Sequence, residues 1–373
     1  ISQIAMVSML NMFIYEFNDG NEKLTPSNIS RMIPGNFYGN RVSTEPEILF
    51  KTWQAQYKLY TQEANELFNI YHDTKEYRYE INLDLENFFP SVHPQMLYNL
   101  ILSLAPVTLT GKELELYKVI LIKLLICKIS NLDSDTSAIY YGMNVPDSGP
   151  FFGTGIAQGL PQSYFLGNIC MTEISKIFER NFKGISLFYV DDSVIFSNDI
   201  ESGEDFERKL DQINKEIRKM MEEYIQLMDD DFFRKYNEEM ITFLRNQSFS
   251  VQVHDTNGKS TYTEISQAKD GEIHLRSLSR AASQIGFELS ASYSEEEDNN
   301  LNAKMEVLLE AIAQEQKLLM ETAEESQCEE GRETYKAKLS RYLKYFKYRK
   351  MKLDVQRNDI PVSVENHNIL IST

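Results

Sequence analysis

Residues 184–197 read GISLFYVDDSVIFS, two short apolar runs on either side of Asp191 and Asp192. Both runs are rich in β-branched and aromatic residues, which favour strands, and the acidic pair between them suits a turn. The pattern predicts a β-hairpin that carries both aspartates at or beside its turn. Strand ends hold carboxylates more rigidly than free loops do, because the sheet ladder fixes their backbone.

A third aspartate lies near the end of a second predicted strand. Residues 77–85 read YRYEINLDL, alternate in character, and reach Asp84 just before a turn. A helix is expected to follow as far as about Ser103, with Ser91 or His93 near its cap. The two acidic segments therefore both place carboxylates where strands end.

The remaining segments predict a mixed α+β chain in three regions. Mostly helical structure is expected over residues 1–70, with breaks at the turn-rich stretches 18–20 and 34–36. Helices are also expected over 114–129, 162–182, 201–245 and from 294 to about 357, with a turn-rich connector over 133–155 and a strand–turn–strand over 249–273. The predicted regions are 1–75, 76–275 and 276–373, and 373 residues suffice for two or three packed lobes.

Composition narrows the class of protein. The chain is 42% hydrophobic and 25% charged, and no apolar run approaches the roughly 20 residues that cross a bilayer. We therefore expect a soluble protein with no membrane partner. Its three cysteines lack C-x-x-C spacing, which favours a reducing compartment, the cytoplasm, over a disulfide framework or a zinc site.

The net charge of −18 is unusual for a protein that binds nucleic acid, but the acidity is local. Residues 292–331 hold twelve acidic residues and two lysines, whereas residues 335–353 hold eight Lys or Arg and no acid. On a helix, Lys344, Lys347 and Lys350 would share one face and could meet phosphates. Neutralisation of this helix by the acidic stretch is the alternative.

A few rigidly placed aspartates suit nucleotidyl transfer. Two Mg²⁺ ions about 3.5–4 Å apart can activate a 3′-hydroxyl and hold the triphosphate, and Mn²⁺ can substitute. Mg²⁺ prefers oxygen ligands and needs few protein carboxylates. Asp84, Asp191 and Asp192 supply such a set.

Three strings in order resemble the motifs of reverse transcriptases. Residues 84–91 read DLENFFPS, residues 158–163 read QGLPQS and precede Leu-Gly-Asn at 166–168, and residues 189–192 read YVDD. The resemblance implies a right-hand polymerase, with palm and fingers built on an antiparallel sheet flanked by helices, and a helical C-terminal region. It implies an RNA-directed DNA polymerase that uses dNTPs and a DNA or RNA strand.

Carried over to this sequence, the resemblance implies that Asp84 and Asp191 ligate the metal ions, with Asp192 beside them. It also implies that the Leu85 carbonyl is a backbone ligand. Phe89 lies where the family places an aromatic ring under the incoming sugar, so that a 2′-hydroxyl would clash; simple core packing is the alternative.

The resemblance assigns further contacts to substrates. Gln158 and Gly159 are expected to touch nucleotide and template, and Tyr189 to lie near the primer terminus. A lysine that donates to pyrophosphate is expected in a later loop. Lys259 is the first candidate and Lys269 the second, with a solvated turn lysine as the alternative.

Two other interpretations of the sequence are weaker. The glycines of residues 153–159 follow G-x-G-x-x-x-G without a preceding long strand, which does not fit a dinucleotide fold. His93, His254 and His274 share no metal-ligand spacing and are predicted to be caps or surface residues.

Within the family, the first string and the acidic, helix-rich flanks look most like bacterial abortive-infection reverse transcriptases. That likeness implies antiviral defence, a nucleic-acid or protein primer, templated or untemplated synthesis, and a homo-oligomer or partner subunits. An RNA-templated retron or group-II-like enzyme is the alternative. A palm that serves only as a non-catalytic scaffold, or an acidic interaction protein with a chance YVDD, would require the ordered motifs to lack their usual role.

Overall fold

The computed structural model describes residues 2–16, 25–45, 48–126, 128–129, 151–152, 155–227, 251–256 and 260–268, together with Val307 and Ala311. The chain divides into two compact units, residues 1–266 and 267–373, and the elements below lie in or at the end of the first. None of the helices in the described ranges is long and apolar enough to cross a membrane. The boundaries predicted after residues 75 and 275 stay predictions.

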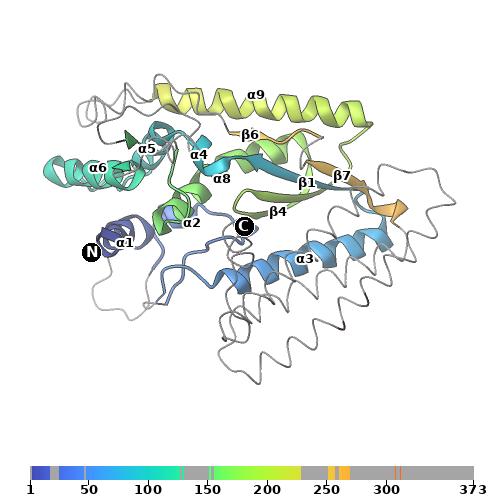
Figure 1. The fold of residues 1–373 in the computed structure, drawn as a ribbon, viewed down its shortest axis with the longest axis horizontal. Coiled ribbons are helices and arrows are strands. Elements are labelled where there is room, and N and C mark those ends of the chain that lie inside the picture. The colour runs from blue at the N-terminus through green and yellow to red at the C-terminus, as the bar shows by residue number, and fades with distance from the viewer. Residues whose placement is uncertain are drawn as a thin grey trace, which may run out of the picture. The chain divides into compact units, whose positions relative to one another are not determined.

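An antiparallel sheet forms the centre of the first unit (Figure 1). Its path runs β4 (Gly184–Tyr189), β5 (Asp192–Ser197), β1 (Tyr79–Glu86) and β6 (Gln252–Val253), and β7 (Thr261–Glu264) also pairs with β1. Every one of these pairings is antiparallel. The predicted α+β fold with an antiparallel sheet flanked by helices is confirmed.

Helices surround this sheet. They are α1 (Ser2–Ile14), α2 (Asn28–Arg31), α3 (Trp53–Thr74), α4 (Phe88–Ser91), α5 (Pro94–Ser103), α6 (Gly111–Leu125), α8 (Pro161–Asn181) and α9 (Gly203–Leu227), with a 3-10 turn at Ile265–Gln267. The helix predicted over 114–129 is wrong at its end, because Ile126 is extended and β2 (Lys128–Ile129) pairs with β3 (Phe151–Phe152).

The two faces of the sheet pack against different helices. Ile81, Phe188 and Ile195 are fully buried on one face and belong to the main apolar core, which also takes in α5, α8 and α9. On the other face the ring of Phe196 lies 5.3 Å from that of Tyr71, which belongs to α3. Figure 1 shows α9 and α3 on opposite sides of the sheet. The sheet is therefore held between helices.

The described residues between α2 and α3, 32–45 and 48–52, are not helical, so the non-helical stretch is longer than the break predicted at residues 34–36. Part of it runs along the free edge of β4, where Phe37 and Phe188 form a parallel bridge. The Tyr38 amide donates to the Phe188 carbonyl at 2.8 Å, and the Phe188 amide donates to the Asn36 carbonyl at 2.9 Å. This pairing covers the outer strand at its site end.

His93 caps α5, as the sequence predicted for a cap or surface histidine. Its Nδ1 accepts a hydrogen bond from the Gln95 amide at 3.1 Å, which requires an unprotonated nitrogen. Burial lowers the pKa of His93 from 6.5 to about 4. The folded state therefore holds this histidine neutral, whereas the unfolded chain protonates it near its ordinary pKa.

This difference predicts a loss of stability in mild acid. As pH falls from about 6.5 to about 4, the unfolded state takes up the proton first, so up to about 3 kcal/mol of stability is lost in that window. His93→Asn keeps a capping side chain without the titration, so its melting temperature should fall less over the same range. Thermal melts of both proteins between pH 7 and 4 test this, and parallel curves would contradict it.

Candidate active site

Two aspartates of the site face each other across neighbouring strands. The register of β1 and β5 places Asp84 directly opposite Asp192, and that of β4 and β5 places Tyr189 opposite Asp192. Directly opposed residues project to the same face of a sheet. The predicted hairpin is thus confirmed, and it brings Asp192 to the same place as Asp84, although 108 residues separate them.

The hydrogen bonds of β1 show how close this pairing is. The Asp84 carbonyl accepts from the His254 amide at 3.0 Å, on the side of β6. Asp84 and Asp192 are therefore a non-hydrogen-bonded pair, the kind with Cα atoms about 4.5 Å apart and the closer side chains. Because carbonyls alternate along a strand, that of Leu85 points away from β6, toward the side where β5 begins.

Asp191 lies in the two-residue turn of the hairpin, between Tyr189 and Asp192. Its neighbour Val190 has a φ of 57°, while Asp191 is not among the residues with positive φ. Positive φ at only the first central residue is the pattern of a type II′ turn, which normally takes glycine there. A β-branched residue in this region is strained, so the surrounding structure must hold the turn.

His254 is a site residue that the sequence interpretation missed. Its Nε2 lies 3.2 Å from Asp84 Oδ2, and its Nδ1 lies 3.2 Å from Glu86 Oε1. The alternation of Val251, Gln252 and Val253 could have placed His254 on the opposite face from the valines. It could not reveal that β6 pairs with β1, which sets His254 beside Asp84.

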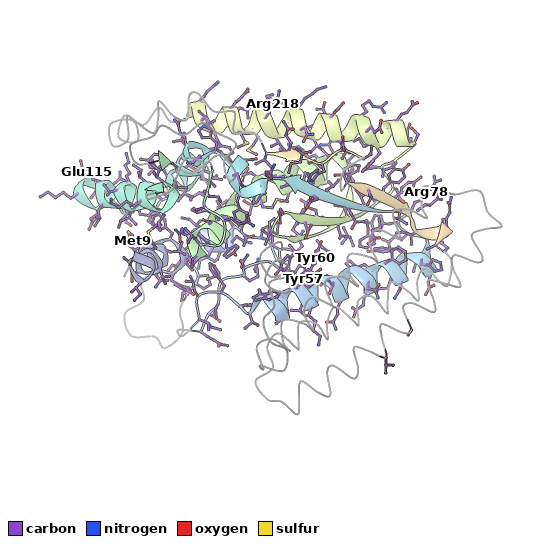
Figure 2. All side chains as sticks on the ribbon, viewed as in Figure 1. Met9, Tyr57, Tyr60, Arg78, Glu115 and Arg218 are labelled. Carbon is purple, nitrogen blue, oxygen red and sulfur yellow. The ribbon has the colours of Figure 1, made fainter. Side chains whose placement is uncertain are left out.

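Tyr189 is enclosed by α3. Its ring lies 5.1 Å from that of Tyr57 and 5.6 Å from that of Tyr60, and its hydroxyl is 3.5 Å from the Trp53 carbonyl. Figure 2 shows Tyr57 and Tyr60 on the side of α3 that faces the sheet. Burial, with a smaller contribution from Asp192, raises the pKa of Tyr189 to about 12. This hydroxyl stays protonated at neutral pH.

Phe89, Gln158 and Gly159 are the residues that the resemblance assigned to nucleotide and template contacts. Phe89 is only 6% exposed, and its ring lies 5.4 Å from that of Phe88 and 5.9 Å from that of Tyr164. Gln158 and Gly159 are exposed just before α8. Gly159 has a φ of 87° with open space around it, so backbone conformation is one reason for a glycine there.

Several predicted contacts lie outside the described residues. These are the two candidate lysines of the late loop and the three lysines of the basic stretch: Lys259, Lys269, Lys344, Lys347 and Lys350. Their roles stay predictions, and so does the fate of His274.

Comparison with known protein families identifies the type of domain that carries these aspartates. Residues 43–226 match the family model described as reverse transcriptase (RNA-dependent DNA polymerase). Over these residues the chain is similar to a reverse transcriptase domain. The match indicates an enzyme with RNA-directed DNA polymerase activity, which acts on nucleotides and nucleic acid. No curated protein gives a significant match to the chain.

The match spans most of the sites that the sequence singled out. The three ordered strings all fall inside residues 43–226, and so do α3, β1, α8, β4 and β5. His254 and the strands β6 and β7 lie C-terminal to it. The matched range therefore contains all three aspartates, whereas the histidine beside Asp84 is contributed from outside it.

The acidic residues of the matched range suit a hard divalent cation by donor type. Asp84 and Asp192 offer carboxylate oxygens from opposed strands, and like charges in that position destabilise a sheet. A cation would remove that repulsion. Among the described side chains, however, no three His, Cys, Asp or Glu residues already lie close enough together to form a metal site. Closure of the ligand set would need side-chain rotation or a substrate phosphate.

The opposed carboxylates predict an effect on stability. Without divalent ions, Asp192→Asn should raise the free energy of unfolding by about 0.2–1 kcal/mol, because one of two facing charges is removed. Mg²⁺ should then stabilise the wild-type protein more than the variant. Chemical unfolding in EDTA and in Mg²⁺ measures both effects.

Asp211→Asn is the matched control, because Asp211 is exposed on α9 and should change stability by no more than about 0.5 kcal/mol. Equal effects of the two substitutions, with or without Mg²⁺, would contradict repulsion at the site.

Proposed function

We propose that the chain extends a primer from dNTPs with two Mg²⁺ ions, or Mn²⁺ in their place, held by Asp84 and Asp191. Asp192 and the Leu85 carbonyl complete the proposed ligand set. The observation that carries the proposal is the register of β1 and β5, which sets Asp84 opposite Asp192 with Asp191 in the adjoining turn. An oxygen-rich, rigid set of this kind is what magnesium-dependent nucleotidyl transfer requires.

The bound ions would lower the pKa of the primer hydroxyl and offset the charge that develops on the triphosphate. The protein's part is to fix the carboxylates before the reaction, since a carboxylate placed in advance costs no reorganisation. Asp84 stands on the central strand, between β5 and β6. The backbone that carries it is therefore paired on both sides.

The substrate contacts in this proposal follow the motifs. Phe89 would lie under the sugar of the incoming dNTP, Gln158 and Gly159 would contact nucleotide and template, and Tyr189 would approach the primer terminus. The exposure of Gln158 and Gly159 supports access to a ligand. Lys259 would donate to pyrophosphate, and Lys344, Lys347 and Lys350 would contact nucleic-acid phosphates.

The biological setting that we propose is bacterial antiviral defence of the abortive-infection type. Support comes from the likeness of residues 84–91 and of the acidic flanks to that group. In this setting the primer could be a protein, synthesis could be untemplated, and partner subunits or further copies of the chain would be expected. Incubation with Mg²⁺ and each labelled dNTP, with and without an RNA template, separates these modes by whether label migrates with nucleic acid or with protein.

Loss of one carboxylate should abolish incorporation. Asp191→Ala is expected to lower kcat by at least about 10³-fold, since several kcal/mol of charge stabilisation would be lost. The fold should persist, because the turn residue is not in the core. Asp211→Ala on the exposed face of α9 is the control, and near-wild-type incorporation by Asp191→Ala would sink the two-metal assignment.

Substitution of the two neighbouring rings, Phe89 and Phe88, tests which of them selects deoxyribonucleotides over ribonucleotides. Phe89→Ala should raise incorporation of ribonucleotides relative to deoxyribonucleotides by about 10- to 100-fold, because the steric conflict with a 2′-hydroxyl is removed. Phe88→Ala is the matched control, since Phe88 is buried beside Phe89 and its loss also opens a cavity. Equal selectivity changes in both variants would return Phe89 to core packing alone.

A further inference from the structure

We propose that Gly39 is a positioning residue for polymerisation. Its close packing against Val190 fixes the Val190–Asp191 turn, and with it the position of the Asp191 carboxylate. The inference rests on the role proposed for Asp191, and it adds a part of the chain that none of the three motif strings contains. Its basis is the close packing of the segment between α2 and α3 against the turn.

Gly39 touches the turn so closely that no side chain fits between them. A Cβ at this position would lie 2.6 Å from Val190 Cγ2 and 2.9 Å from the Val190 backbone nitrogen, both closer than real Cβ contacts allow. Gly39 does not have a positive φ, so its backbone conformation suits any residue. The glycine is needed for the approach alone.

The segment that carries Gly39 cannot easily retreat, because it is bonded to the strand leading into the turn. Beyond the two backbone hydrogen bonds that join Asn36 and Tyr38 to Phe188, the Asn36 Nδ2 donates to the Ser186 carbonyl at 2.9 Å. Phe188 and Ser186 both lie on β4, which ends at Tyr189, immediately before the turn. The turn and its support therefore move as one piece.

A second anchor comes from α8. Asn168 is only 1% exposed, and its Nδ2 donates to the Gly39 carbonyl at 2.8 Å. Asn168 belongs to the second motif string, so this bond links that string to the YVDD turn through Gly39. Loss of a buried donor would leave the Gly39 carbonyl without this bond and release one side of the support.

The strain at Val190 explains why such support matters. A β-branched residue with a φ of 57° is held in a conformation that it would leave if space allowed. Gly39 fills that space on one side of the turn. The position of Asp191 is then set by packing rather than by the intrinsic preference of the turn, and a shift of about 1 Å in a reacting group can cost about 100-fold in rate.

The test compares Gly39→Ala with Gly35→Ala. Gly35 lies in the same segment, has no positive φ, and would bring a Cβ near no other atom within 4 Å, so its substitution controls for the loss of a glycine. For Gly39→Ala we expect kcat to fall by about 10- to 100-fold with KM for dNTP changed less than about threefold. The Mn²⁺ affinity of the free protein, followed by electron paramagnetic resonance, should fall as well.

A compensating change tests the contact itself. Val190→Gly removes the Cγ2 atom and accepts positive φ, but it leaves the Val190 backbone nitrogen 2.9 Å from the added Cβ. Gly39→Ala should therefore cost less activity and Mn²⁺ affinity in a Val190→Gly background than in wild type, with part of the loss remaining. If Gly39→Ala does not fold, as judged by circular dichroism, Asn168→Asp replaces it. That variant keeps the shape but loses the donor to the Gly39 carbonyl, and it should lower kcat and Mn²⁺ affinity in the same direction.

The outcomes separate this inference from the proposed function. If the wild-type protein incorporates dNTPs and Gly39→Ala has the same kcat and Mn²⁺ affinity, the positioning role alone is overturned. It is overturned as well if the loss caused by Gly39→Ala is just as large in the Val190→Gly background. An inactive wild-type protein would count against the proposed function. The Mn²⁺ titration then still decides the role of Gly39, which fails if Gly39→Ala binds as Gly35→Ala does.

Discussion

The pairing of Asp84 with Asp192 across β1 and β5 is the constraint on which the rest of the structure depends. Two like charges on facing positions of a sheet repel, so the strands that carry them must be held by other interactions. The opposite face of the same strands supplies these, since Leu83 and Ile195 are buried in the main core. Apolar burial on one face thus stabilises an unfavourable charge arrangement on the other.

The site is assembled from parts that are distant in sequence. Gly155 shows how closely they fit: a Cβ there would lie 2.1 Å from the Phe89 carbonyl oxygen, and the Ile156 amide donates to that oxygen at 2.9 Å. Gly167 on α8 similarly leaves room for the rings of Phe88 and Phe89. Glycines next to the second string therefore allow the first string to lie against it, as Gly39 does for the third.

Local patterns predicted most of the secondary structure near the site. The hairpin over 184–197 and the helix over 162–182 agree with β4, β5 and α8 to within a residue or so, because alternation and helical periodicity are properties of the segment itself. Contacts set by register were not predictable in this way. His254 and Gly39 reach the site only through pairing of β6 with β1 and of residues 36–38 with β4.

The two opposed acids differ in solvation, and this difference orders their dependence on a cation. Asp192 is exposed, so water can screen its charge, whereas Asp84 is 8% exposed and lies beside Asp192 on the same face. Burial of a carboxylate costs free energy unless a positive partner or a hydrogen-bond donor compensates it. His254 occupies part of that role, at 3.2 Å from Asp84 Oδ2. Of these two proposed ligands, Asp84 consequently has the more to gain from a bound cation, and strand pairing on both sides of β1 fixes its backbone.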